Sequence, residues 1–92
     1  MKYKITVTNK YLKDLKLARK RGLDETRLNS IVEMLATDIP LDKQYRDHNL
    51  KGNYTGFREC HINADWLLIY YKDKDIRIIS LERTGTHSDL FK

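Results

Sequence analysis

Hydrophobic residues recur with two different periods in the first part of the chain, and these periods predict one strand followed by two helices. Residues 3–7 alternate in polarity and are rich in β-branched types, as in a strand. Residues 9–21 and 25–38 carry apolar side chains three and four positions apart, which is typical of amphipathic helices. We expect Asn9 and Asp24 to be their N-caps. Gly22 should end the first helix, and Pro40 should end the second near residue 38.

An irregular segment and three short strands make up the rest of the chain. Residues 40–56 have no sustained period and contain two glycines, so we expect a long loop of the kind that is often functional. Strands are predicted at 57–62, 66–71 and 76–82, joined by short turns. The order β-α-α-β-β-β predicts one α+β domain over residues 1–92. A two-helix hairpin packs on a mainly antiparallel sheet in this fold, and a short C-terminal tail follows.

The predicted turns also indicate which side chains share a face of the sheet, because alternate residues of a strand point to opposite sides. A turn at Asn63-Ala64 pairs His61 with Trp66, and a turn centred on Asp73-Lys74 pairs Tyr70 with Arg77. A bulge would reverse part of this pattern. One face is expected to carry His61, Trp66, Tyr70, Arg77 and Arg83. The helix-facing side is expected to carry Cys60, Ile62, Leu67, Ile69 and Ile78.

Composition is that of a soluble globular protein, with 40% hydrophobic and 34% charged residues. The first ten residues lack the apolar stretch of a secretory signal. No apolar run approaches the roughly 20 residues that a transmembrane helix needs. Cys60 is the only cysteine, so no internal disulfide can form, which fits a cytoplasmic protein. Because strand alternation points Cys60 to the core, we interpret it as a small hydrophobe and not as a nucleophile.

Positive charge is concentrated in the first quarter of the chain. Residues 1–22 hold eight Lys and Arg against one acid, Asp14, whereas the remaining residues have a net charge of −2. Such a patch attracts a polyanion, above all nucleic acid, or an acidic protein partner. A solvated helix surface is the alternative interpretation. The lysines of the first helix that form the patch are Lys10, Lys13, Lys16 and Lys20.

All three histidines, His48, His61 and His87, lie in the second half of the chain, close to arginines. Histidine transfers protons near neutrality, and the arginine fork matches two phosphate oxygens, so the combination indicates proton transfer at a phosphate. Structural histidines and metal ligands are the alternatives. The sequence has no Cys-x-x-Cys or His-Glu-x-x-His spacing, and we therefore expect no metal site.

The residues around these histidines also have two interpretations each. Asp65 is either a turn residue or a carboxylate that raises the basicity of a histidine. Arg58 and Arg83 either form surface ion pairs or hold the scissile phosphate. Trp66, Tyr70 and Phe91 are either core residues or platforms on which unpaired RNA bases stack.

The chain resembles the YafQ branch of the RelE superfamily, which are toxins of bacterial type II toxin–antitoxin pairs. The resemblance is specific in residues 47–91. It rests on the motifs Asp47-His48-x-Leu50-x-Gly52-x-x-x-Gly56-x-Arg58-x-x-His61-x-x-x-Asp65-Trp66-x-Leu68-Ile69-Tyr70 and Arg83-Thr84-Gly85-Thr86-His87-x-x-Leu90-Phe91. The superfamily's small α+β fold agrees with the predicted order of elements.

The resemblance implies an endoribonuclease that cuts messenger RNA during translation in the A site of the 70S ribosome. It also implies a cognate antitoxin, through which alone the complex binds operator DNA. The implied site residues are His48, His61, Asp65, Arg83, His87 and Phe91, and we extend this set to Arg58 and Trp66. The name-giving branch of the superfamily uses Lys, Arg and Tyr instead of histidines, so the mechanism is inferred from the histidine-bearing branch only.

The expected reaction needs no metal and no cofactor, because the 2′-hydroxyl of RNA is the nucleophile. We predict that His87 donates the proton to the leaving oxygen and that Asp65, with His61 or His48, is the base. Arg83 would stabilise the charge on phosphorus, Phe91 would orient a base, and the basic first helix would steer the protein to ribosomal RNA. Two rival hypotheses are a non-catalytic RNA- or DNA-binding module and a subunit that only holds an acidic protein.

Overall fold

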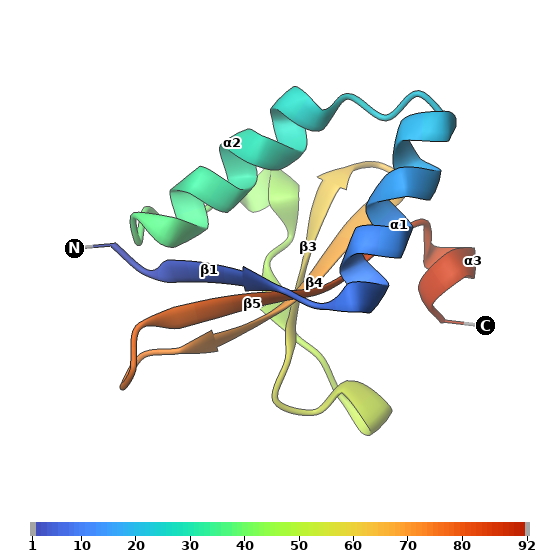
Figure 1. Cartoon of the computed structure of the whole chain (residues 1–92). Helices are drawn as coiled ribbons and strands as arrows, with labels where there is room; N and C mark the ends of the chain where they lie inside the picture. Colours follow the sequence, from blue (N-terminus) through green and yellow to red (C-terminus); the bar gives the residue numbers. More distant parts are fainter. Residues whose placement is uncertain (1, 92) are drawn as a thin grey trace.

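The computed structural model describes residues 2–91, which form a five-stranded sheet and three α-helices (Figure 1). No helix in these residues is long and apolar enough to cross a membrane. The elements in chain order are β1 (Lys4–Val7), α1 (Asn9–Lys20), α2 (Glu25–Ala36), the 3₁₀ turn η1 (Lys43–Tyr45), β2 (His48–Asn49), the 3₁₀ turn η2 (Gly52–Tyr54), β3 (Arg58–Asn63), β4 (Trp66–Asp73), β5 (Ile78–Gly85) and α3 (His87–Leu90).

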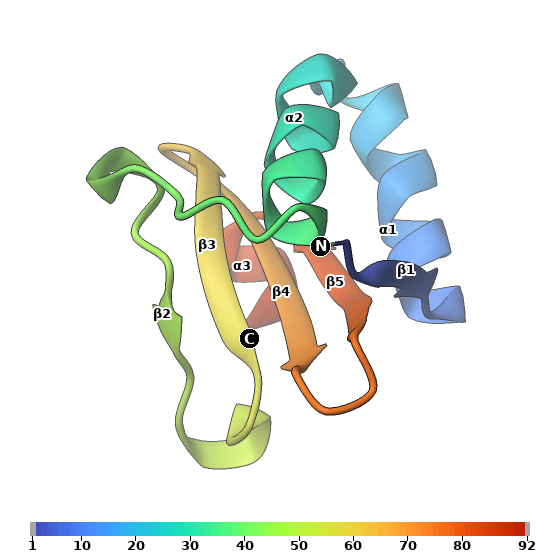
Figure 2. The same ribbon diagram turned by 90° about the vertical axis from the view of Figure 1, so that its left-hand side faces the viewer.

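The strands are arranged in the order β1-β5-β4-β3-β2 (Figure 2). The first strand runs parallel to β5, and every other neighbouring pair is antiparallel. The two long helices pack on one face of the sheet, while η2 and α3 lie toward the other (Figure 1). The predicted α+β fold, with a helix hairpin on a mainly antiparallel sheet, is confirmed.

The helix ends follow the capping residues closely. Thr8, and not Asn9, is the N-cap of α1: its Oγ1 accepts a hydrogen bond from the Tyr11 N–H at 3.0 Å. Asp24 is the N-cap of α2, as predicted, and accepts from the Thr26 N–H at 2.9 Å. Gly22 has φ +82° directly after α1, a conformation that favours glycine and ends the helix there.

Two hydrophobic clusters lie on opposite faces of the sheet. The larger one joins the sheet to α1 and α2 and contains Tyr3, Tyr11, Ala18, Leu28, Ile31, Leu35, Cys60, Ile62, Trp66, Leu68, Tyr70, Ile79 and Leu81. The smaller cluster, on the open face, contains Leu67, Ile69 and Leu90, with Leu50, Tyr54, Phe57 and Phe91 packed around them. The open face is therefore partly apolar but is not covered by a long helix.

The predicted register of both hairpins is wrong. In the first hairpin Asn63 lies opposite Trp66 and His61 opposite Leu67, with a bulge between His61 and Asn63. In the second, the turn covers residues 74–77, and Tyr70 lies opposite Leu81. A further bulge between positions 69 and 70 adds one residue to β5. Each bulge shifts the pairing by one residue and so changes the face to which later side chains point.

These bulges change which side chains share the open face. Trp66 and Tyr70 were expected beside His61, but both lie in the helix-facing core. Leu67 and Ile69 take the open face instead, and Ile79 enters the helix-facing core where Ile78 was expected. The predictions for Cys60 and Ile62 are confirmed, since both are fully buried on the helix side. Burial also raises the pKa of the Cys60 thiol, which suits a core residue and not a nucleophile.

Two elements were not expected from the sequence. Within the predicted loop, β2 forms only two residue pairs with β3, His48 with Glu59 and Asn49 with Arg58. The predicted tail contains α3, a single helical turn that begins directly after Thr86. Both elements carry histidines of the motif, so each one fixes a side chain that a loop or tail would leave mobile.

Candidate active site

Three titratable side chains meet on the open face of β2 and β3. His48 lies opposite Glu59, and His61 follows Glu59 by two positions, so all three point to the same side. The Glu59 atom Oε1 is 3.4 Å from His48 Nε2 and 3.6 Å from His61 Nε2. The two imidazole rings are 6.4 Å apart. We refer to these three residues as the Glu59 cluster.

The carboxylate of this cluster is buried and incompletely bonded. Glu59 is 5% exposed, and within residues 2–91 its Oε2 has no hydrogen-bond partner. His48 Nδ1 donates to the Arg46 carbonyl oxygen at 2.5 Å, which turns the Nε2 of His48 toward Glu59. A buried carboxylate oxygen without a partner costs stability, and proteins retain such groups mainly where chemistry requires them.

A second group of motif residues gathers where β5 meets α3. It consists of Arg83, His87 and Phe91, which we call the α3 group. His87 is the first residue of α3, and its ring centroid is 4.9 Å from that of Phe91. The Phe91 ring in turn packs edge-on against Tyr54 at 5.7 Å. His87 is exposed, so its ring is accessible to a ligand on this face.

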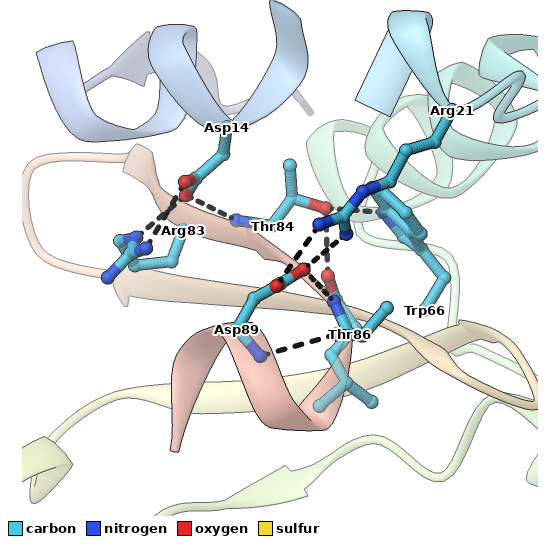
Figure 3. A network of polar contacts seen from close by, with 8 residues as sticks. Asp14, Arg21, Trp66, Arg83, Thr84, Thr86 and Asp89 are labelled. Carbon is cyan, nitrogen blue, oxygen red and sulfur yellow. Dashed lines mark hydrogen bonds and ion pairs between the residues drawn. The ribbon is translucent and has the colours of Figure 1, made fainter. Parts of the chain in front are cut away.

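Hydrogen bonds from both ends hold α3 in place (Figure 3). Thr86 and Asp89 form a capping box, in which the Thr86 hydroxyl accepts from the Asp89 N–H and the Asp89 carboxylate accepts from the Thr86 N–H. Arg21 of α1 donates to the same carboxylate at 2.7 Å. The hydrogen bond from Arg21 and the one from the Thr86 backbone lower the pKa of Asp89 to about 2. The position of His87 thus depends on α1.

Arg83 is also tied to α1, through Asp14 (Figure 3). Its Nε and NH2 donate to the two Asp14 oxygens at 2.7 and 3.1 Å, and the Thr84 N–H donates to the same carboxylate. The hydrogen bond with Asp14 is the main cause of the raised pKa of Arg83. The pair fixes the plane of the guanidinium, and Tyr54 contributes to the raised pKa of Arg83 as well.

The two groups occupy the same face but different strands. His48, Glu59, Ile69 and Arg83 are successive cross-strand neighbours. With strands spaced about 4.8 Å apart, the backbones of β2 and β5 are about 14 Å apart and those of β3 and β5 about 10 Å. Leu67, Ile69 and Leu90 form the floor between the groups. The structure therefore brings His48 and His61 together and places His87 on the same face with Arg83 and Phe91.

Three other predicted site residues lie outside these groups. Trp66 is 7% exposed in the helix-facing core, where its Nε1 donates to Thr84 Oγ1 at 2.8 Å, so its ring cannot stack on a base. Arg58 donates to the side chains of Asp47 and Asn49. Asp65 is exposed in the β3–β4 turn, and its backbone N–H donates to Asn63 Oδ1. Asp65 thus has the turn role that was its alternative interpretation.

The predicted lysine patch lies on α1, the helix whose Asp14 and Arg21 bind Arg83 and Asp89. Its four members, Lys10, Lys13, Lys16 and Lys20, are all exposed. Leu12 and Leu17 of the same helix are also exposed, at 46% and 43%. This surface combines positive charge with apolar area, which suits contact with another macromolecule as well as solvation.

Sequence reasoning missed three contributors to the site. Glu59 could have been found, because strand alternation puts it on the same face as His61. Asp14 stood out only as the single acid in a basic region, and nothing in the sequence paired it with Arg83. Tyr54, which packs on Phe91, lies in the aperiodic segment and gave no signal.

Comparison with known proteins connects the chain to a family. Residues 3–92 match the family model described as bacterial toxin of type II toxin-antitoxin system, YafQ. The chain is 42% identical over 88 residues to the mRNA interferase toxin YafQ of Escherichia coli strain K12, covering 95% of this chain and 94% of that protein.

Solved structures are similar over the whole chain as well. The E. coli DinJ-YafQ toxin–antitoxin complex contains a chain with a TM-score of 0.90 and 38% identity, with 100% of both chains covered. A metal-bound toxin from Helicobacter pylori has a TM-score of 0.90 and 44% identity, covering 97% of this chain and 99% of that one. The fold described above is thus also found in crystal structures.

Proposed function

The chain belongs to the YafQ family of bacterial toxins of type II toxin–antitoxin systems, and from this premise we propose that it is an mRNA interferase. In this proposal the whole of residues 1–92 is one toxin domain that cleaves translated messenger RNA and thereby stops growth. The relative named an mRNA interferase toxin covers almost the entire chain, which supports carrying its activity over.

One observation carries the proposal: a single open face of the sheet holds both the Glu59 cluster and the α3 group. The first supplies a carboxylate and two imidazoles, and the second supplies a guanidinium, an imidazole and an aromatic ring. These are the groups that phosphodiester cleavage without a cofactor requires. A module that only binds RNA has no use for three histidines and a buried, incompletely bonded carboxylate on one face.

Cleavage uses the nucleophile that RNA itself carries. A base removes the proton of the 2′-hydroxyl, and the oxygen attacks the adjacent phosphorus in line. The bond from phosphorus to the 5′-oxygen breaks, and an acid protonates that oxygen as it leaves. The products are a 2′,3′-cyclic phosphate on one fragment and a 5′-hydroxyl on the other. Each positioned acid or base contributes roughly 10²–10⁴-fold to the rate.

The arrangement of the site assigns these roles to its two groups. His87 is the acid, because it is exposed beside Phe91, on which the leaving nucleotide can pack. Arg83 stabilises the charge on the phosphate, held in orientation by Asp14. His61 and Arg83 come from strands about 10 Å apart on the same face, with β4 between them.

The Glu59 cluster is the base in this mechanism, in place of Asp65. Glu59 contacts both histidines, whereas Asp65 is a turn residue. The carboxylate can draw the 2′-hydroxyl proton through His61 or His48. The exposed side chain of Asp65 lies in the neighbouring turn, where RNA can still contact it.

We propose that this reaction proceeds without a metal ion, since neither the nucleophile nor the acid requires one. Within residues 2–91, no group of three or more His, Cys, Asp or Glu side chains is arranged to hold a metal. A similar H. pylori toxin has been crystallised with metal bound, so the point needs a direct test. Protein dialysed against EDTA should cleave at the same rate as untreated protein. Loss of activity on dialysis, with recovery on adding a divalent ion, would contradict this part.

The expected partners and cellular location follow from the family. We expect a cognate antitoxin, because a similar E. coli toxin was solved in the DinJ-YafQ complex, and operator DNA is contacted only through that partner. The working location is the bacterial cytoplasm, where messenger RNA occupies the ribosomal A site. Here the lysines of α1 guide the protein to ribosomal RNA, an attraction that weakens with added salt.

The test is inducible expression of the parent protein and of His87→Ala, with mapping of transcript ends. The parent should stop growth and create new ends inside coding regions, while His87→Ala should do neither and should still fold. Ser88→Ala, an exposed neighbour on α3, is the matched control and should behave like the parent. If His87→Ala creates the same ends as the parent, the catalytic assignment is wrong.

The same experiment separates the rival functions. A non-catalytic RNA-binding module would stop growth without creating new transcript ends, and His87→Ala would change little. A subunit that only holds an acidic partner would not stop growth when expressed alone. DNA should remain uncleaved under the proposal, because it lacks the 2′-hydroxyl that is the nucleophile.

A further inference from the structure

A cavity opens beside His61 at one end of the sheet. Its volume is about 270 Å³, and it is lined by Arg27, Gln44, Arg46, His61, Asn63 and Ala64. The lining comes from the start of α2, from η1 and from the β3–β4 turn, which lie together at one end of the molecule (Figure 2). His61 belongs both to this cavity and to the Glu59 cluster, so the cavity continues directly from the proposed site of cleavage.

The two arginines of the cavity differ from the arginines described above. Arg19, Arg21, Arg58 and Arg83 each form an ion pair with a carboxylate. Within residues 2–91, Arg27 and Arg46 have no carboxylate partner, and both are exposed. Two unneutralised guanidinium groups on one small cavity create a local excess of positive charge. Such a site binds an anion, above all a phosphate, which the guanidinium fork matches.

The side chain of Arg27 and the backbone of Arg46 are also held in position. The guanidinium of Arg27 lies over the Tyr45 ring, 5.6 Å from its centroid, which limits the motion of an otherwise flexible side chain. The backbone of Arg46 has φ +48°, a left-handed conformation that is uncommon for arginine. In this conformation the Arg46 carbonyl accepts the hydrogen bond from His48 Nδ1. The cavity is thus linked to the Glu59 cluster through Arg46 as well as through His61.

The remaining polar side chains of the cavity are carboxamides. Asn63 Oδ1 accepts from the Asp65 N–H, which leaves the amide N–H groups of Asn63 free to donate. Gln44 is exposed and carries both a donor and an acceptor. Paired donors and acceptors of this kind read the edges of nucleic-acid bases, which a charged group alone does not.

We infer that this cavity is a nucleotide subsite for the substrate RNA, next to the linkage that is cut. Arg27 and Arg46 hold the phosphate of that nucleotide, and Gln44 and Asn63 face its base. The inference rests on the proposed function, because the RNA must run from the Glu59 cluster into the cavity. An acidic protein partner is the less favoured occupant, since the cavity shares His61 with the proposed catalytic face.

Binding of a non-cleavable RNA tests the phosphate contact. The probe is a labelled octanucleotide with 2′-O-methyl groups, and its affinity is measured by fluorescence anisotropy over a range of salt concentrations. Each phosphate contact that is lost should reduce the slope of log affinity against log salt by about 0.7. The double variant Arg27→Gln, Arg46→Gln should therefore lose about 0.7 from the slope, because both arginines hold the same phosphate, and its affinity at low salt should fall by about tenfold or more.

The matched control removes two positive charges elsewhere. Lys43→Gln with Lys74→Gln has the same net charge as the double arginine variant, and both lysines are exposed and outside the cavity lining. This control should keep the slope of the parent. Equal slopes for the two double variants would overturn the subsite. Retained RNA binding together with loss of cognate antitoxin binding would overturn it too, and would assign the cavity to the protein partner.

Cleavage mapping tests the base contact and separates the two proposals. Gln44→Ala should change the relative use of cut sites by about tenfold, because discrimination between bases falls by about that much when a base contact is lost. A parent protein that creates no new transcript ends would refute the proposed function. A parent that cuts, with a Gln44→Ala profile identical to its own, would refute only the reading of the base in the cavity.

Discussion

The Glu59 cluster and the α3 group lie on the same face of the sheet and contain similar side chains, but their charged groups differ in how firmly they are paired. In the α3 group, Arg83 is paired with Asp14, and the helix itself is anchored through the Asp89–Arg21 pair. In the Glu59 cluster, the contacts to the histidines are longer, at 3.4 and 3.6 Å, and Glu59 Oε2 is unbonded within residues 2–91.

This difference separates two tasks of one reaction. A charge that must stay in place near a phosphate benefits from firm partners that fix its direction. A group that must accept and release a proton benefits from loose contacts, because a firm ion pair would hold it in one protonation state. The fixed end of the site costs little stability, whereas the end that moves protons keeps a buried carboxylate that is poorly satisfied.

The largest loss of cleavage activity should come from Glu59→Gln, which keeps the shape of the side chain and removes its charge. Single-turnover cleavage of translated messenger RNA should slow by roughly 10²–10³-fold, because the base is lost. The free energy of unfolding, measured in urea, should stay the same or rise by about 1 kcal/mol, since an unsatisfied buried charge is removed. Glu33→Gln, an exposed change on α2, should leave both unchanged. A large loss of stability in Glu59→Gln would show a structural role instead.

A smaller effect on the rate is expected from Asp14→Asn, which loosens the fixed end. The guanidinium of Arg83 keeps its charge but loses its orientation, so cleavage should slow by about 10- to 100-fold. Binding of the non-cleavable octanucleotide should change less than twofold. A variant of Arg83 itself should weaken this binding more. Asp42→Asn, an exposed aspartate without a side-chain cap bond, is the control. Equal rates for the two variants would mean that Asp14 does not position Arg83.

Trp66→Phe tests whether the two faces of the sheet are as separate as the register indicates. The change removes the buried hydrogen bond to Thr84, so the free energy of unfolding should fall by about 1–2 kcal/mol. RNA affinity should stay unchanged, because the ring lies on the helix side of the sheet. Weaker RNA binding by a variant that is otherwise folded would place Trp66 at the substrate, against the structure.

The smallest effect should be a loss of stability in Asp89→Asn, and the size of this loss should depend on pH. The pKa of Asp89 is lowered from 3.8 to about 2 in the folded protein, so its ion pair stabilises the fold above about pH 4. At pH 7 the variant should be less stable by about 1 kcal/mol, which lowers the melting temperature by about 4–8 °C. This difference should shrink as the pH falls from 4 toward 2. A difference that persists at pH 2 would exclude the ion pair as its cause.

The fold could be predicted from the sequence to the extent that local patterns determine it. The helical spacing of apolar residues, together with Asp24 and Gly22, was enough to predict the two helices. The alternation of polar and apolar residues was enough to predict the strands. The register was not predictable, because the bulges between His61 and Asn63 and in β5 leave no mark on the hydrophobic pattern. That single gap explains why Trp66 and Tyr70 were assigned to the wrong face.

The site was predictable only where one short segment carries it. The motif Arg83 to Phe91 holds the α3 group within nine residues, so its members were found together. The partner of Arg83 comes from 69 positions away, and no local pattern encodes such a distance. Strand alternation alone puts Glu59 on the face of His61, but its contact with His48 depends on β2, which the sequence pattern did not predict.

The parallel pairing of β1 with β5 has a consequence for how the protein is made. The first strand can complete its hydrogen bonds only with a strand that the ribosome synthesises last, and Arg83 and His87 follow on that same stretch. Contacts between distant parts of a chain form late in folding. A chain that has been synthesised only as far as β4 therefore cannot yet form the part of the sheet that carries Arg83 and His87.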